Sequence, residues 1–269
     1  MKKIIIFGGN GFIGTHITSF FLMDNGFEVH VVTRLKVKKN LNIYNSKLKV
    51  HFINLFNKKD IQILFKDIKP DYIIQLAWCS EHKKYWNDPD NTFWVEINRC
   101  ISKNFINNGG ERAIFIGSSA EYDWSSNEKL NEFTTNLYPQ SLYGKSKLKS
   151  FYEISEIFDK ENKSMIWARL FNPFGPGEDK RRLIPKISIN LIKNKKLEFD
   201  DGQNIRDFTH VNDVAYLIYK LLKTNYSGPI NISSGDEVII KDIIIKAAKF
   251  FKKENLISFN SSRKEIKHP

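Results

Sequence analysis

The chain has 269 residues, of which 41% are apolar and 27% charged, so it is long enough for one large α/β domain or a main domain with a small appendage. Its formal net charge of +12 raises the question of nucleic-acid or membrane binding. The basic residues are scattered through Lys- and Asn-rich loops and do not gather with aromatic residues into one stripe. We therefore expect no nucleic-acid partner, only a bias toward small anionic ligands.

Cysteine usage and the amino-terminal segment bear on the compartment. There are two cysteines, Cys79 and Cys100, and the apolar run after Met1 is stopped at once by glycines, unlike a signal peptide. This pattern predicts a reduced, cytoplasmic protein. No run approaches the ~20 apolar residues that a membrane span needs, so no membrane partner is expected. Cys79 and His82 have the spacing of metal ligands, but no second Cys/His pair accompanies them, so we expect no metal site.

The first predicted element is a strand over Lys2 to Phe7, which breaks into a glycine-rich turn and then a helical pattern over Thr15 to Met23. The turn contains Gly8, Gly11 and Gly14. Where a strand leads through such a turn into a helix, the backbone N–H groups and the positive end of the helix face a bound pyrophosphate. Side chains in the turn would block this approach, and glycine has none. The sequence therefore predicts a dinucleotide site here.

Apolar, strand-like runs then alternate with helical stretches, which is typical of an α/β fold with a doubly wound parallel Rossmann sheet. The runs are Ile4–Phe7, Val29–Thr33, Val50–Ile53, Tyr72–Leu76, Ala113–Gly117 and Ile166–Leu170. After Leu170 the alternation becomes irregular, with short segments at 196–199 and 230–232. We expect a dinucleotide-binding domain over residues 1–170 and mainly a small C-terminal substrate-binding lobe over 171–269, with some segments returning to the first domain.

The fifth run ends in two hydroxyls, Ser118 and Ser119, at the sheet edge where open α/β sheets bind ligands. The next helical segment carries Tyr143 and Lys147 one turn apart on one face. A phenol titrates near ~10, and a cation one turn away favours its ionised form. Two further Tyr-x-x-x-Lys pairs, at 216/220 and 219/223, lie in an amphipathic stretch that we interpret as an ordinary surface helix.

The cofactor type depends on the end of the second strand, where a carboxylate that binds the adenosine ribose signals NAD. That position holds Thr33, followed by Arg34. A missing carboxylate together with a cation suits a 2′-phosphate, so we expect NADP (NADPH), with NAD the less favoured choice. Asn54, at the end of the third strand, is expected to face the adenine.

With these motifs in place, the chain resembles the extended short-chain dehydrogenases/reductases that modify nucleotide sugars, and is closest in type to reductases of nucleotide-diphosphate 4-keto-6-deoxysugars. The resemblance runs from Lys2 to about Gly235. It rests on five motifs in order: Gly8/Gly11/Gly14, Ser118–Tyr122, Tyr143–Lys147, Arg169–Gly177, and Gly202 with Arg206–Asp213.

The resemblance implies roles for individual residues. Tyr143 exchanges a proton with the sugar while hydride passes to or from nicotinamide, Lys147 holds the cofactor ribose and acidifies Tyr143, and Ser119 hydrogen-bonds the reacting oxygen. The implied cofactor-binding residues are Gly8, Gly11, Phe12, Ile13, Gly14, Thr33, Arg34, Asn54, Leu55, Leu76, Ala77, Trp78, Tyr143 and Lys147. The implied substrate-binding residues are Ser119, Asn172, Arg182 and Arg206, the last of which could instead pair with Asp207 or Asp213.

Glu121 keeps a second function open, because the resembling dehydratases carry a glutamate two places after the catalytic hydroxyl and use it to move a proton at a sugar carbon. The first hypothesis is NADPH-dependent reduction of a 4-keto-6-deoxysugar on a nucleotide diphosphate. The alternative is an epimerase or 4,6-dehydratase with tightly bound NAD and Glu121 as an additional acid/base. A third, a non-catalytic nucleotide-binding regulator, is disfavoured by the intact set of Ser119, Tyr143 and Lys147.

Two further expectations follow from the resemblance. Trp78 stands beside the cofactor where the family usually has a small residue, so the pocket is expected to be narrowed or the nearby loop displaced. Family members commonly pair through the helix that carries Tyr143 and the helix before it, so we expect a homodimer.

Overall fold

The computed structural model describes residues 1–34, 45–125 and 129–260. The described chain divides into two compact units. Of the described residues, those within 1–170 and 212–232 form the first unit, and 171–211 with 233–260 form the second. Each unit has its own core and is described by itself.

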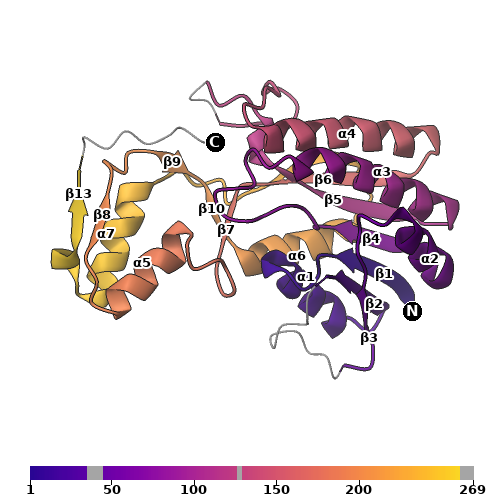
Figure 1. Ribbon diagram of the computed structural model, residues 1–269, viewed down its shortest axis with the longest axis horizontal. Helices are drawn as coiled ribbons and strands as arrows, with labels where there is room; N and C mark the ends of the chain where they lie inside the picture. Colours follow the sequence, from indigo (N-terminus) through magenta and orange to yellow (C-terminus); the bar gives the residue numbers. More distant parts are fainter. Residues whose placement is uncertain (35–44, 126–128, 261–269) are drawn as a thin grey trace. The chain divides into compact units, whose positions relative to one another are not determined.

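A seven-stranded sheet with strand order β11-β6-β5-β4-β1-β2-β3 forms the centre of the first unit (Figure 1). Its strands are β1 (Lys2–Phe7), β2 (Phe27–Thr33), β3 (Leu48–Phe52), β4 (Tyr72–Gln75), β5 (Arg112–Ser118), β6 (Ser164–Leu170) and β11 (Gly228–Ile232). Every neighbouring pair is parallel. The sheet order reverses at β1, which lies between β2 and β4, and this is where such sheets bind ligands at the carboxyl ends of their strands.

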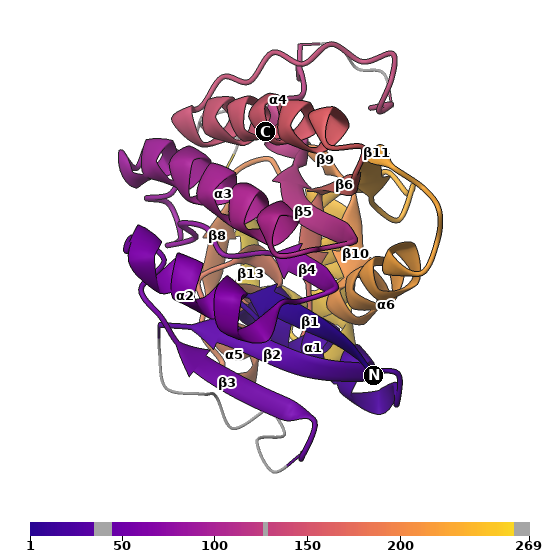
Figure 2. The same ribbon diagram turned by 90° about the vertical axis from the view of Figure 1, so that its right-hand side faces the viewer.

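Both faces of the sheet are buried, because successive side chains of a strand point to opposite sides. In β1, Ile4 and Ile6 belong to one apolar cluster, whereas Ile5 and Phe7 belong to another. Figure 2 shows helices on both faces of the sheet. The first cluster includes α1 (Phe12–Met23) and α6 (Val211–Leu222), and the second includes α2 (Lys58–Ile68), α3 (Asp90–Asn107) and α4 (Leu142–Lys160). The expected doubly wound parallel sheet is therefore confirmed.

The last strand of the sheet comes from far along the chain. Residues 230–232, which the sequence pattern grouped with the irregular carboxyl-terminal part, form the end of β11, and Ile230 pairs with Ala168 of β6. This segment and α6 return to the first unit, because their apolar side chains complete the same cluster that α1 covers.

The second unit is built from short strand pairs and two packed helices. β7 (Asn172–Phe174) pairs with β10 (Phe208–His210), β9 (Ile205–Arg206) with β12 (Val238–Ile239), and β8 (Leu197–Phe199) with β13 (Ile257–Phe259). The helices α5 (Leu183–Ile192) and α7 (Ile240–Phe251) bury Ile187, Leu191, Ile244 and Ala248 against one another.

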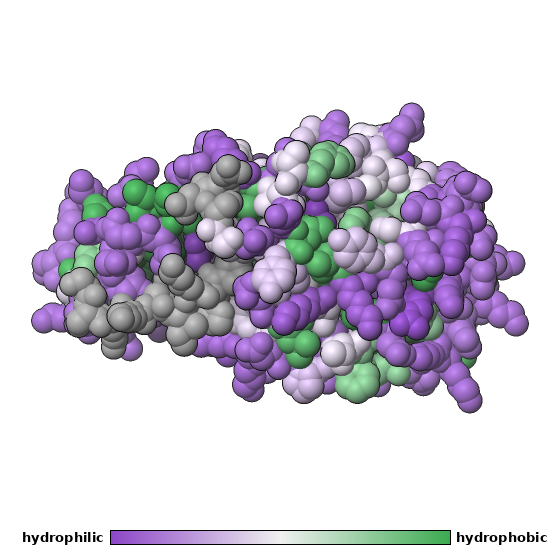
Figure 3. Space-filling model, turned by 90° about the horizontal axis from the view of Figure 1, so that it is seen from above, coloured by the Kyte–Doolittle hydropathy of each residue, from purple (hydrophilic) through white to green (hydrophobic). Residues whose placement is uncertain are grey.

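The face of the molecule in Figure 3 is mostly hydrophilic, and its apolar side chains form small separate groups. Among the described residues, no helix combines the length and the apolar character that crossing a membrane requires.

Candidate active site

The glycine turn after β1 has the geometry that the sequence predicts. Gly8 has a φ of +76°, a left-handed conformation that favours glycine. A Cβ on Gly14 would lie 2.2 Å from the Gly8 carbonyl oxygen, so only glycine lets α1 approach the turn this closely. Gly11 is the N-cap of α1 and supplies no capping side chain, so the first-turn N–H groups beside Phe12 and Ile13 suit a bound pyrophosphate.

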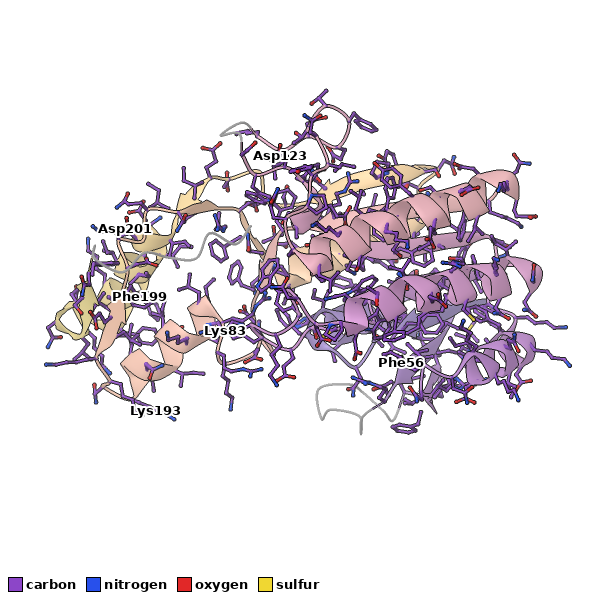
Figure 4. The ribbon with its side chains drawn as sticks, turned by 45° about the horizontal axis from the view of Figure 1, so that its top comes forward. Phe56, Lys83, Asp123, Lys193, Phe199 and Asp201 are labelled. Atoms are coloured by element: carbon purple, nitrogen blue, oxygen red, sulfur yellow. The ribbon has the colours of Figure 1, made fainter. Side chains whose placement is uncertain are left out.

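The next strand ends carry the residues expected near the adenosine. Thr33, the last residue of β2, is buried, and its hydroxyl accepts a hydrogen bond from the Asn10 side chain at 3.5 Å. Arg34 follows and is exposed. After β3, Asn54 is exposed while Leu55 is buried, and the Asn54 side chain accepts a hydrogen bond from the backbone of Phe56 (labelled in Figure 4). The end of β2 therefore offers a hydroxyl and a guanidinium, and no carboxylate, to the adenosine part of a bound nucleotide.

The chain after β4 is held by a buried polar network. The side chain of Gln75 donates to the carbonyl of Ala77 at 3.2 Å and accepts from the Ala77 N–H at 3.2 Å. The same amide donates to Asn98 of α3 at 2.6 Å, and Asn98 donates to Ser150 of α4 at 2.9 Å. This network fixes the half-buried backbone of Leu76 and Ala77 directly before Trp78.

Two adjacent serines at the end of β5 have different partners. Ser118 is the N-cap of a short 3-10 helix, η1 (Ser119–Glu121), and its hydroxyl accepts from the Ala120 N–H at 3.2 Å. The Ser119 carbonyl accepts from the Trp124 indole at 2.9 Å, which holds the start of the turn, and no such capping bond uses the Ser119 hydroxyl. The Ser118 hydroxyl keeps its own proton to donate, so the choice of Ser119 as the residue that bonds a substrate oxygen stays a prediction.

Glu121 occupies a different environment from the one expected. Its carboxylate accepts from the Trp167 indole at 2.9 and 3.0 Å, from the Ser118 N–H at 2.7 Å and from the Arg169 guanidinium at 2.7 Å. The side chain has no exposed surface. Burial raises the pKa of the Glu121 carboxyl, although the Arg169 guanidinium opposes that shift. Both carboxylate oxygens are thus bonded by protein groups, and the acid–base role of Glu121 stays a prediction.

The helix α4 begins at the candidate catalytic tyrosine. Its N-cap Ser141 accepts a hydrogen bond from the Gly144 N–H at 3.0 Å, and the Tyr143 N–H donates to the Trp86 carbonyl at 2.9 Å. A Cβ on Gly144 would lie 2.3 Å from the Ala120 carbonyl oxygen. The glycine therefore lets α4 pack directly on η1, which brings the tyrosine to the same place as the serine turn.

Lys147 lies one turn further along α4, and 3% of its surface is exposed. Its ammonium donates to the Ile116 carbonyl of β5 at 2.7 Å and lies 5.7 Å from the centre of the Tyr143 ring. Desolvation lowers its pKa to about 7, opposed by the charge of Glu121. An ammonium has three N–H donors, so the remaining ones suit the hydroxyls of a cofactor ribose.

Aromatic rings surround Tyr143. Three rings lie nearly perpendicular to the Tyr143 ring, at centroid distances of 5.0 Å for Tyr85, 5.8 Å for Trp86 and 6.3 Å for Trp78. All three belong to the segment after β4, which Figure 4 marks at Lys83. The sequence predicts Trp78 beside the cofactor, and in the structure its indole lies beside Tyr143 and Lys147.

The other expected substrate residues lie in the second unit. Asn172 begins β7, and its side chain donates to the Asp207 carbonyl at 2.9 Å. Arg182 is the N-cap of α5, and Arg206 ends β9 with one donor on the Ile205 carbonyl at 2.8 Å. The Asp207 carboxylate accepts from the backbone N–H groups of Ser234 and Gly235 at 2.8 Å each.

The chain matches the NAD dependent epimerase/dehydratase family over residues 4–233, which is most of its length. It belongs to this family. Its members act on nucleotide sugars with NAD-dependent chemistry, which agrees with the glycine turn and with the serine, tyrosine and lysine gathered at the sheet edge.

Individual relatives of this epimerase/dehydratase-family chain differ in reaction. It is 25% identical over 246 residues to UDP-glucuronic acid decarboxylase 1 of Xenopus tropicalis, covering 88% of this chain but only 57% of that protein's length. It is 26% identical to GDP-6-deoxy-D-talose 4-dehydrogenase of Aggregatibacter actinomycetemcomitans, covering 87% of this chain and 74% of that one. UDP-glucuronic acid 4-epimerase from Bacillus cereus, solved with UDP-glucuronic acid and NAD, superimposes with a TM-score of 0.85 at 22% identity, over 96% of this chain and 85% of the other.

Two buried residues near the candidate site, Asn91 and Arg169, were not among the predicted site residues. Asn91, fully buried in α3, accepts from the Trp78 indole at 2.7 Å and donates to the carbonyls of Tyr85 and Asp88 at 2.7 and 2.8 Å. Nothing in the local sequence distinguishes this asparagine from a surface residue. Arg169 could have been found, because a charged residue within an otherwise apolar strand requires a buried partner.

The sequence predicts no metal site at Cys79 and His82. The thiol of Cys79 donates to Asp88 at 3.1 Å, and burial raises its pKa to about 11, which does not suit a thiolate ligand. Among residues 1–34, 45–125 and 129–260, no cluster of three His, Cys, Asp or Glu is arranged to hold a metal ion.

Proposed function

We propose that this chain is an NADPH-dependent reductase that acts on the 4-keto group of a 6-deoxysugar linked to a nucleotide diphosphate. The observation that carries the choice of cofactor is the end of β2, where buried Thr33 and exposed Arg34 replace the carboxylate that an NAD ribose would need. A guanidinium suits a 2′-phosphate because it offers several donors in a fixed plane.

Each of three residues of the first unit has its own role in the proposed reaction. Ser119 hydrogen-bonds the sugar ketone oxygen, and Tyr143 gives that oxygen a proton. Lys147 binds the cofactor ribose and faces the Tyr143 ring. A bound reduced nicotinamide supplies the hydride that reaches the sugar carbon. The ketone thus gains one hydride and one proton and becomes an alcohol.

The residues of the second unit are proposed to bind the diphosphate. Asn172, Arg182 and Arg206 supply amide and guanidinium donors, which suit phosphate oxygens. The relative from Aggregatibacter supports the class of sugar, because its name describes a dehydrogenase that acts at position 4 of a nucleotide-linked 6-deoxysugar.

The alternative is an epimerase or 4,6-dehydratase that keeps NAD tightly bound. The similarity to an epimerase solved with NAD supports it. Within this alternative, the enclosure of Glu121 by Arg169 and Trp167 favours epimerisation over dehydration, because dehydration needs a further acid/base at the sugar.

The bound nucleotide separates the two proposals. The purified protein is denatured, and the released nucleotide is identified and counted. Stoichiometric NAD would overturn the reductase proposal and support the alternative. An empty protein that consumes NADPH only when a nucleotide 4-keto-6-deoxysugar is added would support the reductase. Failure to consume NADPH with several such sugars would count against it.

We also propose a homodimer that pairs through α3 and α4. Tyr152 of α4 and Phe93 of α3 are each 56% exposed, and pairing with a second copy through these helices would bury them. Light scattering during gel filtration tests this, and a monomer that stays a monomer at high concentration would overturn it.

A further inference from the structure

The ammonium of Lys147 lies over the face of the Trp78 indole. The distance from Nζ to the ring centre is 3.8 Å, which is short enough for a cation–π interaction. The same ammonium donates to the Ile116 carbonyl at 2.7 Å. The indole therefore occupies one side of a lysine that burial separates from water.

The indole is held in place without help from the lysine. Its Nε1 donates to the side chain of fully buried Asn91 at 2.7 Å, and its ring stacks on Trp94 with a centroid distance of 5.9 Å and an interplanar angle of 23°. On the backbone side, Gln75 bonds both the N–H and the carbonyl of Ala77. Trp78 is thus a fixed surface on which the ammonium rests.

We propose that Trp78 is a positioning residue, whose indole face holds the Lys147 ammonium in its charged form and in place beside Tyr143. The proposal rests on the proposed role of Lys147 as the residue that binds the cofactor ribose. It gives a reason for a large aromatic side chain at this position, because the ring supplies negative potential beside an ammonium that is only 3% exposed.

Burial and the neighbouring charges together determine how strongly the charged form of Lys147 is disfavoured. Desolvation lowers the pKa of this lysine to about 7 and the negative charge of Glu121 raises it. Arg169 of β6 pairs with that carboxylate, which weakens its help, and Tyr143 is the other titratable group that faces the ammonium. A cation–π contact favours the charged lysine, so it raises the pKa relative to an equally buried site without the ring.

A residue that merely fills space would give the same packing without this electrostatic effect. Fluorination of tryptophan separates the two, because each fluorine withdraws charge from the ring face while its size changes little. The whole protein is produced with ordinary, monofluorinated, difluorinated or trifluorinated tryptophan and with nitrogen-15-labelled lysine. The Lys147 signal is assigned by its loss in Lys147→Met, and its titration is followed by NMR.

The expected result is a titration midpoint that falls stepwise with each added fluorine, by up to about one pH unit in total. The matched control is Trp78→Phe, in which the remaining tryptophans are fluorinated but none lies over Lys147, so its midpoint should not respond. A midpoint in the wild-type chain that stays constant across the series, or that responds equally in Trp78→Phe, would overturn the proposal. The measurement needs neither nucleotide nor sugar, so failure of the proposed reductase activity leaves its outcome interpretable.

Discussion

The carboxylate of Glu121 and the guanidinium of Arg169 form an ion pair at 2.7 Å in which neither side chain has any exposed surface. The same carboxylate accepts the backbone N–H of Ser118, the residue before the candidate catalytic serine. Glu121 therefore ties the end of β5 to β6 and fixes the turn in which Ser119 sits.

Glu121→Gln should destabilise the fold by roughly 3–5 kcal/mol, because it leaves the Arg169 charge buried without its partner. Urea unfolding measures the change. The matched control is Glu156→Gln, which breaks an exposed pair with Lys160 at 2.6 Å and should leave the free energy of unfolding nearly unchanged. A Glu121→Gln protein of wild-type stability would contradict the structural role. The double variant with Arg169→Met should recover much of the loss.

Tyr143→Phe should reduce turnover by roughly 100- to 10 000-fold, because it removes the proton donor. Tyr219→Phe is the matched control. Tyr219 also stands four residues before a lysine and contacts Lys223 at 2.6 Å, but the pair bonds Asp24 at the end of α1. This control should keep full turnover and lose about 1 kcal/mol of stability. Equal activity of both variants would refute the assignment of Tyr143.

Gly144→Ala should lower kcat by about 100-fold, because the added methyl would lie 2.3 Å from the Ala120 carbonyl oxygen and push α4 away from η1. Overpacking of this kind also costs roughly 1–3 kcal/mol. Steady-state kinetics and thermal unfolding measure the two effects. Lys145→Ala, at the exposed neighbouring position, should change neither. An active, stable Gly144→Ala enzyme would show that close packing of the two elements is dispensable.

Stability should decrease as the pH falls below about 6.5, because the pair of buried His30 in β2 and half-buried His51 in β3 is partly desolvated. His30 Nδ1 lies 2.9 Å from His51 Nε2, and desolvation lowers the pKa of both rings below the ordinary value. The unfolded chain then binds more protons than the folded one, so the neutral pair stabilises the fold above that pH and loses this effect on acidification. Urea unfolding across the range should show a smaller pH slope for His51→Gln. Identical slopes would contradict the assignment.

Arg34→Ala should weaken NADPH binding by about tenfold and leave NADH binding unchanged, because only NADPH carries the 2′-phosphate that the guanidinium would bond. Thr33→Asp should shift the preference toward NADH by adding a carboxylate for the ribose hydroxyls. Titration calorimetry with both nucleotides measures the selectivity. Unchanged NADPH affinity in Arg34→Ala would point to NAD as the natural cofactor.

The strands of the sheet and the glycine turn were predictable, because both depend on local patterns. The apolar runs at Ile4–Phe7 and Ala113–Gly117 are long enough to be recognised, and the turn at Gly8 follows the first of them directly. The placement of 230–232 in the sheet was not predictable, because a three-residue run gains its partner β6 only through packing of segments far apart in sequence.

The candidate site was predictable to a smaller extent. Tyr143 and Lys147 could be paired by helical spacing, but the enclosure of Glu121 depends on Trp167 and Arg169, which sequence distance separates from it. Likewise, the sequence marks Trp78 as unusual in size, whereas its contact with the lysine depends on Asn91, which no local pattern reveals.

The burial of Lys147 has a practical consequence for handling this protein. Reagents that attack amines will react with exposed lysines such as Lys145 long before Lys147, which is 3% exposed. Coupling to an amine-reactive resin or a fluorescent ester should therefore modify lysines on the surface and leave Lys147 unmodified.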